Sequence, residues 1–154
     1  MTSTKPQVFK SISEEETLNF GIRMAGFLRI GMTLAMYGDL GSGKTVLARG
    51  IARGLGITEP VTSPTFTVVQ EYRTAEGEWL YHLDMYRITN EDEALAFGID
   101  EYLFAPDCIT LIEWPERIED ILHTGSRNKP ESPELLSIYI EHKGPEEREI
   151  TIVS

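Results

Sequence analysis

A glycine-rich segment that follows a short apolar stretch limits, more than any other feature, the folds open to this chain. Residues 38–45 read Gly-Asp-Leu-Gly-Ser-Gly-Lys-Thr and match the pattern G-x-x-x-x-G-K-[ST] at every fixed position. The apolar residues 32–37 precede them, as a strand precedes a phosphate-binding loop. Glycine lets several backbone N–H groups turn toward one phosphate without Cβ clashes. The sequence therefore predicts a nucleotide-binding loop (P loop) between a strand and a helix.

Two side chains at the end of this segment carry the expected chemistry. Lys44 would place a fixed positive charge on the β- and γ-phosphates, and the Thr45 hydroxyl would ligate Mg²⁺ where the helix begins. We expect the loop and the residue after it to bind the nucleotide. These residues are Gly38, Asp39, Leu40, Gly41, Ser42, Gly43, Lys44, Thr45 and Val46.

The charge balance argues against one class of function. The chain has 25 acidic residues against 14 basic ones, which gives a formal net charge of −11 at pH 7. Such a surface is poorly suited to neutralising many nucleic-acid phosphates or to lying on an anionic membrane. Any role with a nucleic acid is therefore expected to be indirect.

The length and the apolar content indicate the class of protein. A chain of 154 residues can bury a substantial core, and we expect one domain over residues 1–154. No uninterrupted apolar stretch is long enough to cross a bilayer, and residues 1–9 lack the apolar core of a signal peptide. Cys108 opens an apolar run and is expected to be a small buried hydrophobe in a reducing compartment. These features favour a cytoplasmic location without membrane binding.

Hydrophobic periodicity predicts alternating helices and strands. Ser13 and Glu16 form a capping-box signal, and apolar residues then recur at helical spacing. A second helix is expected over residues 44–53, and a third begins after a cap at Thr89 or Asn90 and ends at residue 97. A loop is expected over residues 124–133. Strands are expected over residues 66–72, 79–83, 108–112, 136–141 and 149–153. Hairpin turns are expected at residues 75–78 and 143–145. The predicted fold is α/β, a P-loop NTPase-like three-layer domain whose central mixed sheet has parallel core strands and antiparallel hairpins.

A P loop needs an acidic partner at the end of a neighbouring strand, because the Mg²⁺ on the terminal phosphates must also be held from the protein side. Asp84 and Glu113 both follow strand-like residues. Glu113 fits better, since residues 108–112 are almost wholly apolar and ligands bind at the carboxyl ends of buried strands. Aspartate is commoner there, so the longer glutamate is a mild departure.

Asp84 has several possible roles. It lies where the alternating strand 79–83 gives way to a turn, and it could order the attacking water, help the metal site or cap the local backbone. His82 alternates out of phase with its apolar neighbours, which favours a hydrogen-bonded structural histidine over a catalytic base. Trp114 follows Glu113 and either packs in the core or projects from the site.

Residues 61–66 join the helix after the P loop to the next strand, where many nucleotide switches place a loop that senses the γ-phosphate. Ser63 and Thr65 offer hydroxyls, and Pro64 stiffens the loop. Hydroxyl groups are also ordinary in turns, so this pattern alone leaves both interpretations open.

Five segments together resemble the TsaE family, the P-loop ATPase of bacterial tRNA threonylcarbamoyladenosine biosynthesis. They are residues 38–45, then Val-Thr-Ser-Pro-Thr-Phe-Thr at 61–67, His-Leu-Asp-Met-Tyr-Arg at 82–87, Gly-Ile-Asp-Glu-Tyr at 98–102 and Leu-Ile-Glu-Trp-Pro-Glu-Arg at 111–117. In order and spacing they cover most of the chain. The P loop alone is unspecific, but the other four are seldom found together elsewhere.

The resemblance implies an ATPase that uses ATP and Mg²⁺ and works with the TsaB and TsaD proteins, which transfer the threonylcarbamoyl group to an adenosine of tRNA. It implies catalytic roles for Lys44, Asp84 and Glu113, metal contacts from Thr45 and Glu113, and a switch at residues 62–66, with Thr65 near the nucleotide. The tRNA would be contacted through the partners. We also expect slow hydrolysis by the isolated chain, because no arginine is evidently placed as a finger.

Two alternatives from other classes remain. A small-molecule kinase usually needs a mobile lid with several arginines. The candidate lid here is the expected loop over residues 124–133, and its basic residues are only Arg127 and Lys129. A nucleotide-gated switch for GTP often carries N-K-x-D, and residues 128–131 come close with a glutamate in place of the aspartate. Neither pattern is well supported.

Overall fold

The structure, a computed structural model, describes residues 6–39, 41–61, 68–103, 105–128 and 135–154. Leu40 lies outside the described residues, and so does most of the expected switch, residues 62–67, including Thr65. No helix in these ranges is both long and apolar enough to span a membrane.

The described part of the chain forms a sheet in the strand order β1-β7-β6-β2-β5-β4-β3, accompanied by four α-helices. The strands are β1 (Gln7–Ser11), β2 (Thr33–Tyr37), β3 (Val69–Arg73), β4 (Trp79–Asp84), β5 (Cys108–Glu113), β6 (Leu135–His142) and β7 (Arg148–Val153). The helices are α1 (Glu14–Ala25), α2 (Lys44–Gly54), α3 (Glu91–Ala96) and α4 (Glu119–Asn128), with short 3-10 helices η1 (Ile99–Glu101) and η2 (Pro115–Ile118).

The centre of the sheet is parallel and its margins are antiparallel. Strand β2 lies between β5 and β6 and runs parallel to both, and β4 runs parallel to β5. Strand β3 pairs antiparallel with β4, β7 with β6, and β1 with β7. The predicted mixed sheet with parallel core strands and antiparallel hairpins is confirmed.

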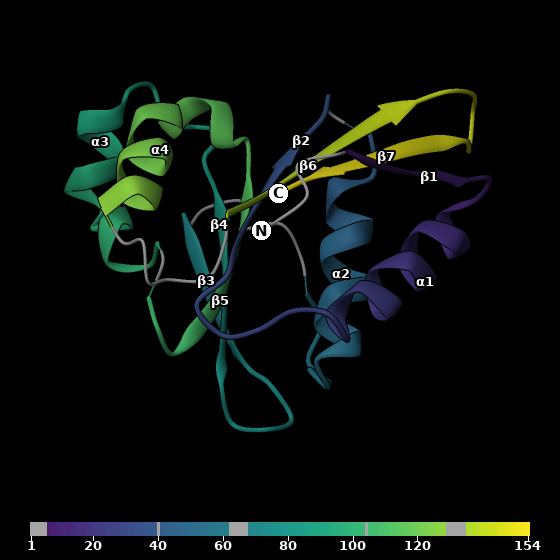
Figure 1. Cartoon of the computed structure of the whole chain (residues 1–154), viewed down its shortest axis with the longest axis horizontal. Coiled ribbons are helices and arrows are strands. Elements are labelled where there is room, and N and C mark those ends of the chain that lie inside the picture. The colour runs from purple at the N-terminus through teal and green to yellow at the C-terminus, as the bar shows by residue number, and fades with distance from the viewer. Residues whose placement is uncertain (1–5, 40, 62–67, 104, 129–134) are drawn as a thin grey trace.

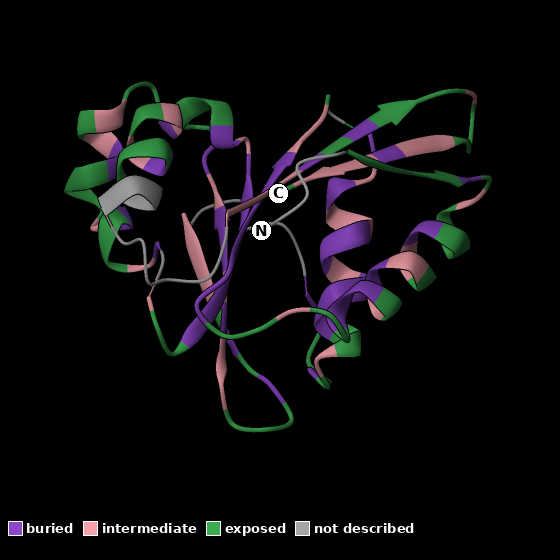
Figure 2. Ribbon diagram, viewed as in Figure 1, coloured by how far each residue is buried: buried purple, intermediate pink, exposed green. Residues whose placement is uncertain are grey.

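The helices cover the two faces of the sheet, with α1 and α2 on one side and α3 and α4 on the other (Figure 1). The sheet has a hydrophobic core on each face, and the central strands contribute side chains to both cores. Leu34 and Met36 of β2 belong to the cluster that contains Leu47 of α2, whereas Ala35 belongs to the cluster that contains Leu122 of α4. Figure 2 shows the buried residues concentrated along the central strands and α2. The alternation of a strand thus builds the three-layer arrangement.

Helices α1 and α2 approach each other closely through glycines. A Cβ at Gly50 would lie 2.2 Å from the carbonyl oxygen of Leu18, and one at Gly21 would lie 2.7 Å from that of Leu47. No side chain fits there without moving the backbone. This contact fixes α2, whose first two residues, Lys44 and Thr45, are the last two of the P loop.

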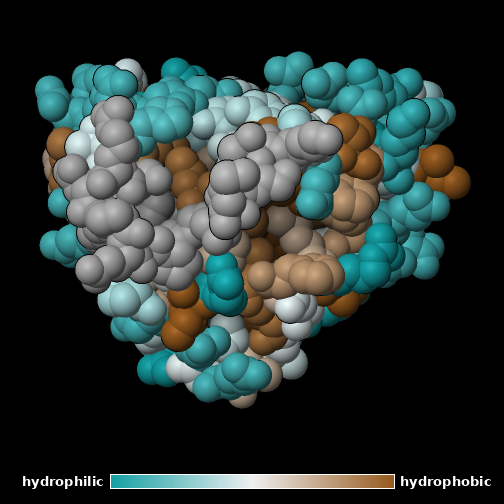
Figure 3. Space-filling model, viewed as in Figure 1, coloured by the Kyte–Doolittle hydropathy of each residue, from teal (hydrophilic) through white to brown (hydrophobic). Residues whose placement is uncertain are grey.

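Several elements begin and end as the sequence predicts. The Ser13 side chain accepts a hydrogen bond from the Glu16 N–H at 3.1 Å, and the Asn90 side chain accepts one from the Glu93 N–H at 2.8 Å. Both caps are confirmed. On the face seen in Figure 3, hydrophilic side chains lie around the rim of the molecule, over α3, α4, α1 and the turns between β6 and β7 and between β3 and β4.

Two features differ from the prediction. Residues 124–128, expected in a loop, form the last part of α4. The glycine and serine there are poor helix formers, but the acidic residues of the first turn favour the helix electrostatically and the buried Leu122 packs it on the sheet, so packing overrides propensity. Strand β1 was not predicted either, because it is an edge strand with four of its five residues exposed. The rest of the expected loop, residues 129–133, lies outside the described residues.

Candidate functional site

The P loop connects the carboxyl end of β2 to the first turn of α2, as the sequence predicts. Gly41 and Gly43 have φ angles of 78° and 112°, which only glycine adopts readily. Gly38 is needed for a different reason, since a Cβ there would lie 2.5 Å from the Ser42 Oγ. The loop conformation therefore depends on the glycines of the motif.

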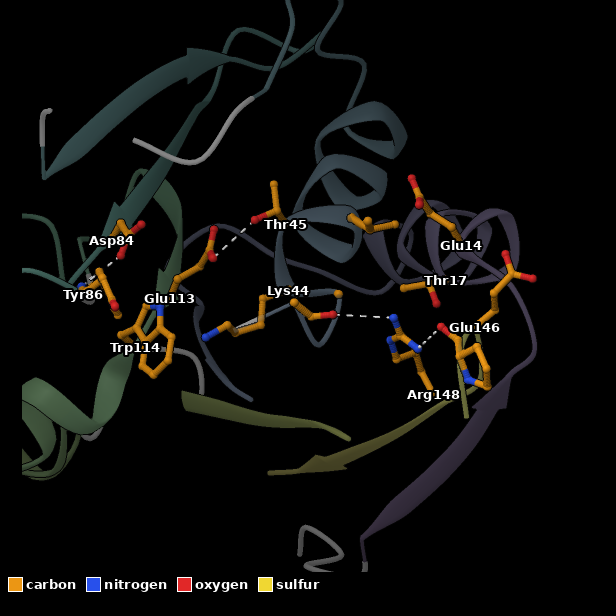
Figure 4. A pocket seen from close by; sticks show the side chains of 14 residues that line it. Glu14, Thr17, Lys44, Thr45, Asp84, Tyr86, Glu113, Trp114, Glu146 and Arg148 are labelled. Atoms are coloured by element: carbon orange, nitrogen blue, oxygen red, sulfur yellow. Dashed lines mark hydrogen bonds between the residues drawn. The ribbon is translucent and has the colours of Figure 1, made fainter. Parts of the chain in front are cut away.

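A cavity of about 530 Å³ opens beside this loop (Figure 4). Its walls come from the P loop and the start of α2, from the residues that end β4 and β5, from the start of α1, and from the turn between β6 and β7. The cavity brings together seven of the residues predicted for the site, which are Gly41, Gly43, Lys44, Thr45, Val46, Asp84 and Glu113. Gly38, Asp39 and Ser42 instead line a smaller hollow beside β6, on the other side of the loop.

Lys44 is buried at the base of the cavity. Its Nζ donates a hydrogen bond to the Gly38 carbonyl at 2.6 Å and lies 3.5 Å from the centre of the Trp114 ring. Burial lowers the pKa of Lys44, although the nearby Glu113 carboxylate acts in the opposite direction. The ammonium is therefore held by the loop backbone and an aromatic face, in a position to contact an anion in the cavity.

Thr45 and Glu113 come together from α2 and β5. The Thr45 hydroxyl donates to the Glu113 Oε1 at 3.5 Å, and the Glu113 side chain is almost fully buried. No group of three or more His, Cys, Asp or Glu side chains among the described residues could hold a metal. A hydroxyl and a carboxylate are the oxygen donors that Mg²⁺ prefers, and Mg²⁺ on a nucleotide takes only one or two protein ligands.

Asp84 lies next to Glu113, because parallel strands β4 and β5 pair these two residues in register. Its Oδ1 accepts a hydrogen bond from the Tyr86 N–H at 2.9 Å, and the residue also lines the cavity. Burial raises the pKa of Asp84, assisted by the Glu113 charge and opposed by the Tyr86 hydrogen bond. The backbone-capping role is thus present, and the carboxylate also reaches the cavity.

His82 is buried and hydrogen-bonded, as the alternation of its strand predicts, but its partner could not be read from the sequence. Its Nε2 lies 2.7 Å from the Glu113 Oε2. The histidine therefore contacts the acid on the side away from Thr45, which approaches the Glu113 Oε1.

Trp114 combines both roles that the sequence left open. It packs against the core on the α3 and α4 side of the sheet, and it also lines the cavity, with its ring centre 5.0 Å from that of Tyr86. Its φ of 59° is unusual for a residue other than glycine. This backbone conformation turns the chain sharply at the end of β5, directly after Glu113.

Arg148, at the start of β7, is a cavity residue that sequence reasoning missed. Its Nε donates to the Ser42 carbonyl at 2.7 Å, and another guanidinium nitrogen lies 3.5 Å from the Gly41 carbonyl. The side chain therefore ties the last hairpin to the P loop. No local pattern marks it, because only the pairing of β7 with β6 and of β6 with β2 brings it there.

Comparison with known proteins gives consistent matches. The family model described as "Threonylcarbamoyl adenosine biosynthesis protein TsaE" matches residues 11–150. The tRNA threonylcarbamoyladenosine biosynthesis protein TsaE of Bacillus subtilis is 41% identical over 146 residues, covering 95% of this chain and 84% of that protein. The protein of the same name from Nostoc is 44% identical over 109 residues, covering 68% of this chain and 65% of that protein. The crystal structure of Bacillus subtilis YdiB superposes with a TM-score of 0.76 at 34% identity, covering 100% of this chain and 88% of that one.

Proposed function

This chain belongs to the TsaE family of threonylcarbamoyl adenosine biosynthesis proteins, and we propose that it is a single-domain, Mg²⁺-dependent ATPase that serves threonylcarbamoyladenosine formation in tRNA. The observation that carries the proposal is the meeting of Lys44, Thr45 and Glu113 in one cavity at the carboxyl ends of the central strands. That edge is where open α/β sheets bind ligands, and phosphate, metal and acid contacts are all needed for phosphoryl transfer.

The P loop would hold the phosphates of ATP. Backbone N–H groups of the loop would face the phosphate oxygens, and Lys44 would leave the Gly38 carbonyl to contact the terminal phosphates. Thr45 and Glu113 would hold Mg²⁺, directly or through water. When bound, the ion would neutralise charge that develops on the terminal phosphates.

Asp84, the second predicted acid in the cavity, is suited to orienting the attacking water. In hydrolysis a water oxygen attacks the γ-phosphorus, the bond to the bridging oxygen breaks, and ADP leaves with the electron pair. Asp84 would accept a hydrogen bond from that water. Its raised pKa makes it a better proton acceptor than an exposed aspartate. Thr65 would sense the γ-phosphate from the loop outside the described residues.

We expect hydrolysis to depend on partners, namely the TsaB and TsaD proteins. Arg148 lines the cavity, but its guanidinium donates to P-loop carbonyls, so it is not free to act as an arginine finger without breaking these bonds. A finger supplied by a partner is worth roughly 10³ to 10⁵ in rate. The net charge of −11 suits contact with a basic face of a partner, and it leaves the tRNA to be bound by the partners.

The deciding experiment measures ATP turnover and tRNA modification with purified TsaB, TsaD and tRNA, with and without this chain. We expect modification to require the chain and turnover to rise when the partners are added. A Glu113→Gln variant should bind ATP but support little turnover. Full modification without the chain would refute the proposal, and phosphorylation of a metabolite would replace it with a kinase. A preference for GTP in competition binding would point instead to a GTP switch.

A further inference from the structure

His82 is a buried polar side chain for which the proposed chemistry gives no role. It is 0% exposed and lies in β4 opposite Leu111, two residues before Glu113 in β5. Leu80 and Leu111 belong to the same core as Leu47 of α2. Since side chains two residues apart share a face of a strand, His82 and Glu113 lie on the side of the sheet that α2 covers.

The two oxygens of the Glu113 carboxylate have different contacts. Oε2 lies 2.7 Å from the His82 Nε2, and Oε1 lies 3.5 Å from the Thr45 hydroxyl. With Glu113 as a carboxylate, which only accepts hydrogen bonds, the donor of this contact is the Nε2–H tautomer of His82. One oxygen therefore contacts a buried side chain within the protein, while the other faces Thr45, the second residue of α2.

Core packing alone does not explain a histidine at this position. Within the described residues, the His82 Nδ1 is buried and has no hydrogen-bond partner. A buried polar atom without a partner is unfavourable, and an apolar side chain in the same place would avoid this loss. The favourable contact of the ring is the one it makes with Glu113.

Glutamate also needs support more than aspartate does. Its side chain has one more rotatable bond, so an unsupported carboxylate at position 113 could turn away from Thr45. We propose that His82 is a positioning residue that fixes Glu113 in the rotamer from which Oε1 faces Thr45 and the cavity. This role rests on the proposed Mg²⁺ site. Hydrogen bonds that orient metal-binding side chains typically change metal affinity ten- to a hundredfold.

Two amide variants separate positioning from packing. His82→Gln places an N–H about as far from the backbone as Nε2, whereas His82→Asn carries the same amide one methylene closer and does not reach Glu113. The affinity for ADP is measured by calorimetry, first in EDTA and then across a series of Mg²⁺ concentrations. This readout needs no turnover.

We expect both variants to bind ADP in EDTA within about threefold of the wild type, because the hydrogen bond that His82 makes within the described ranges goes to Glu113 and not to the P loop. Mg²⁺ should increase the ADP affinity of the wild type, and half of that increase is reached at a characteristic Mg²⁺ concentration. In His82→Asn this concentration should be about tenfold higher or more. His82→Gln should stay within about threefold of the wild type. An equal shift in both variants, or no shift in His82→Asn, would overturn the proposal.

A second variant covers the case in which His82→Asn does not fold, as judged by circular dichroism. Glu113→Asp keeps the charge but draws the carboxylate away from His82, and we expect the same rise in the required Mg²⁺. A wild-type Mg²⁺ response in Glu113→Asp would contradict the positioning role. If ADP affinity of the wild type does not respond to Mg²⁺ at all, the metal site itself is refuted, which is a different outcome.

Discussion

Replacing Lys44 with alanine should weaken nucleotide binding strongly while changing the stability of the nucleotide-free protein little. The Nζ is placed to contact an anion in the cavity, and the loss of one charge-assisted contact costs about 1.5–3 kcal/mol. The ADP affinity should therefore fall roughly ten- to a hundredfold.

The stability side of this prediction follows from opposing effects. Lys44→Ala removes the hydrogen bond to the Gly38 carbonyl and the contact with the Trp114 ring. It also removes a buried charge, and the lowered pKa of Lys44 indicates that burial disfavours that charge. Gly38 is only half-buried, so water can reach its carbonyl. We expect the free energy of unfolding to change by less than about 1 kcal/mol.

Calorimetry measures the ADP affinity and urea unfolding measures the stability, and both are done on the same preparations. Lys10→Ala is the matched control, since Lys10 is an exposed lysine of the edge strand β1 and should leave ADP affinity unchanged. An ADP affinity of Lys44→Ala equal to that of the wild type would refute the assigned contact. A loss of more than about 2 kcal/mol in stability would show that Lys44 is chiefly structural.

Two further changes test the site and its support. Asp84→Asn should lower partner-stimulated ATP turnover about 10²- to 10⁴-fold, yet stabilise the nucleotide-free protein near pH 7. Because the pKa of Asp84 is raised, the folded state holds the proton to higher pH than the unfolded state does, so wild-type stability falls as the pH rises from the usual aspartate value of 3.8 through the folded pKa. Urea unfolding of both proteins at several pH values checks this, and a variant less stable than the wild type at pH 7 would contradict it. Gly50→Ala should lower the free energy of unfolding by about 2–3 kcal/mol, because its Cβ would lie 2.2 Å from a backbone oxygen. Its control is Gly26→Ala, whose Cβ would lie 3.4 Å from the nearest atom and which should leave stability unchanged or raise it by up to about 1 kcal/mol. Equal thermal unfolding temperatures of the two variants would contradict the close contact of α1 and α2.

The parts of the fold that sequence analysis recovered are those determined by short-range pattern. The P loop, the cap at Ser13 and the apolar run of β5 each carry their signal within a few neighbouring residues. The parallel core followed from the same patterns, because a uniformly apolar strand needs cover on both faces. The end of such an apolar run predicted that Glu113 lies at the carboxyl ends of the central strands, and it does.

The contacts that were missed depend on strand register and packing. Arg148 reaches the P loop only because β7 and β6 are aligned on β2, and His82 meets Glu113 only because β4 and β5 are in parallel register. Helix α4 includes residues 124–128, where a loop was expected, because its packing on the sheet outweighs weak helix propensity. A single sequence carries no local trace of these long-range pairings.

The hydrogen bond between Arg148 and the Ser42 carbonyl makes the P loop dependent on a part of the chain that is synthesised later. The P loop is synthesised early, but β6, which pairs with the strand before that loop, and β7, which supplies the arginine, leave the ribosome much later. A nascent chain that ends before β6 leaves one edge of β2 unpaired. We therefore expect such a chain to bind nucleotide poorly, so that nucleotide would bind to molecules that contain β6 and β7 and much less to shorter translation products.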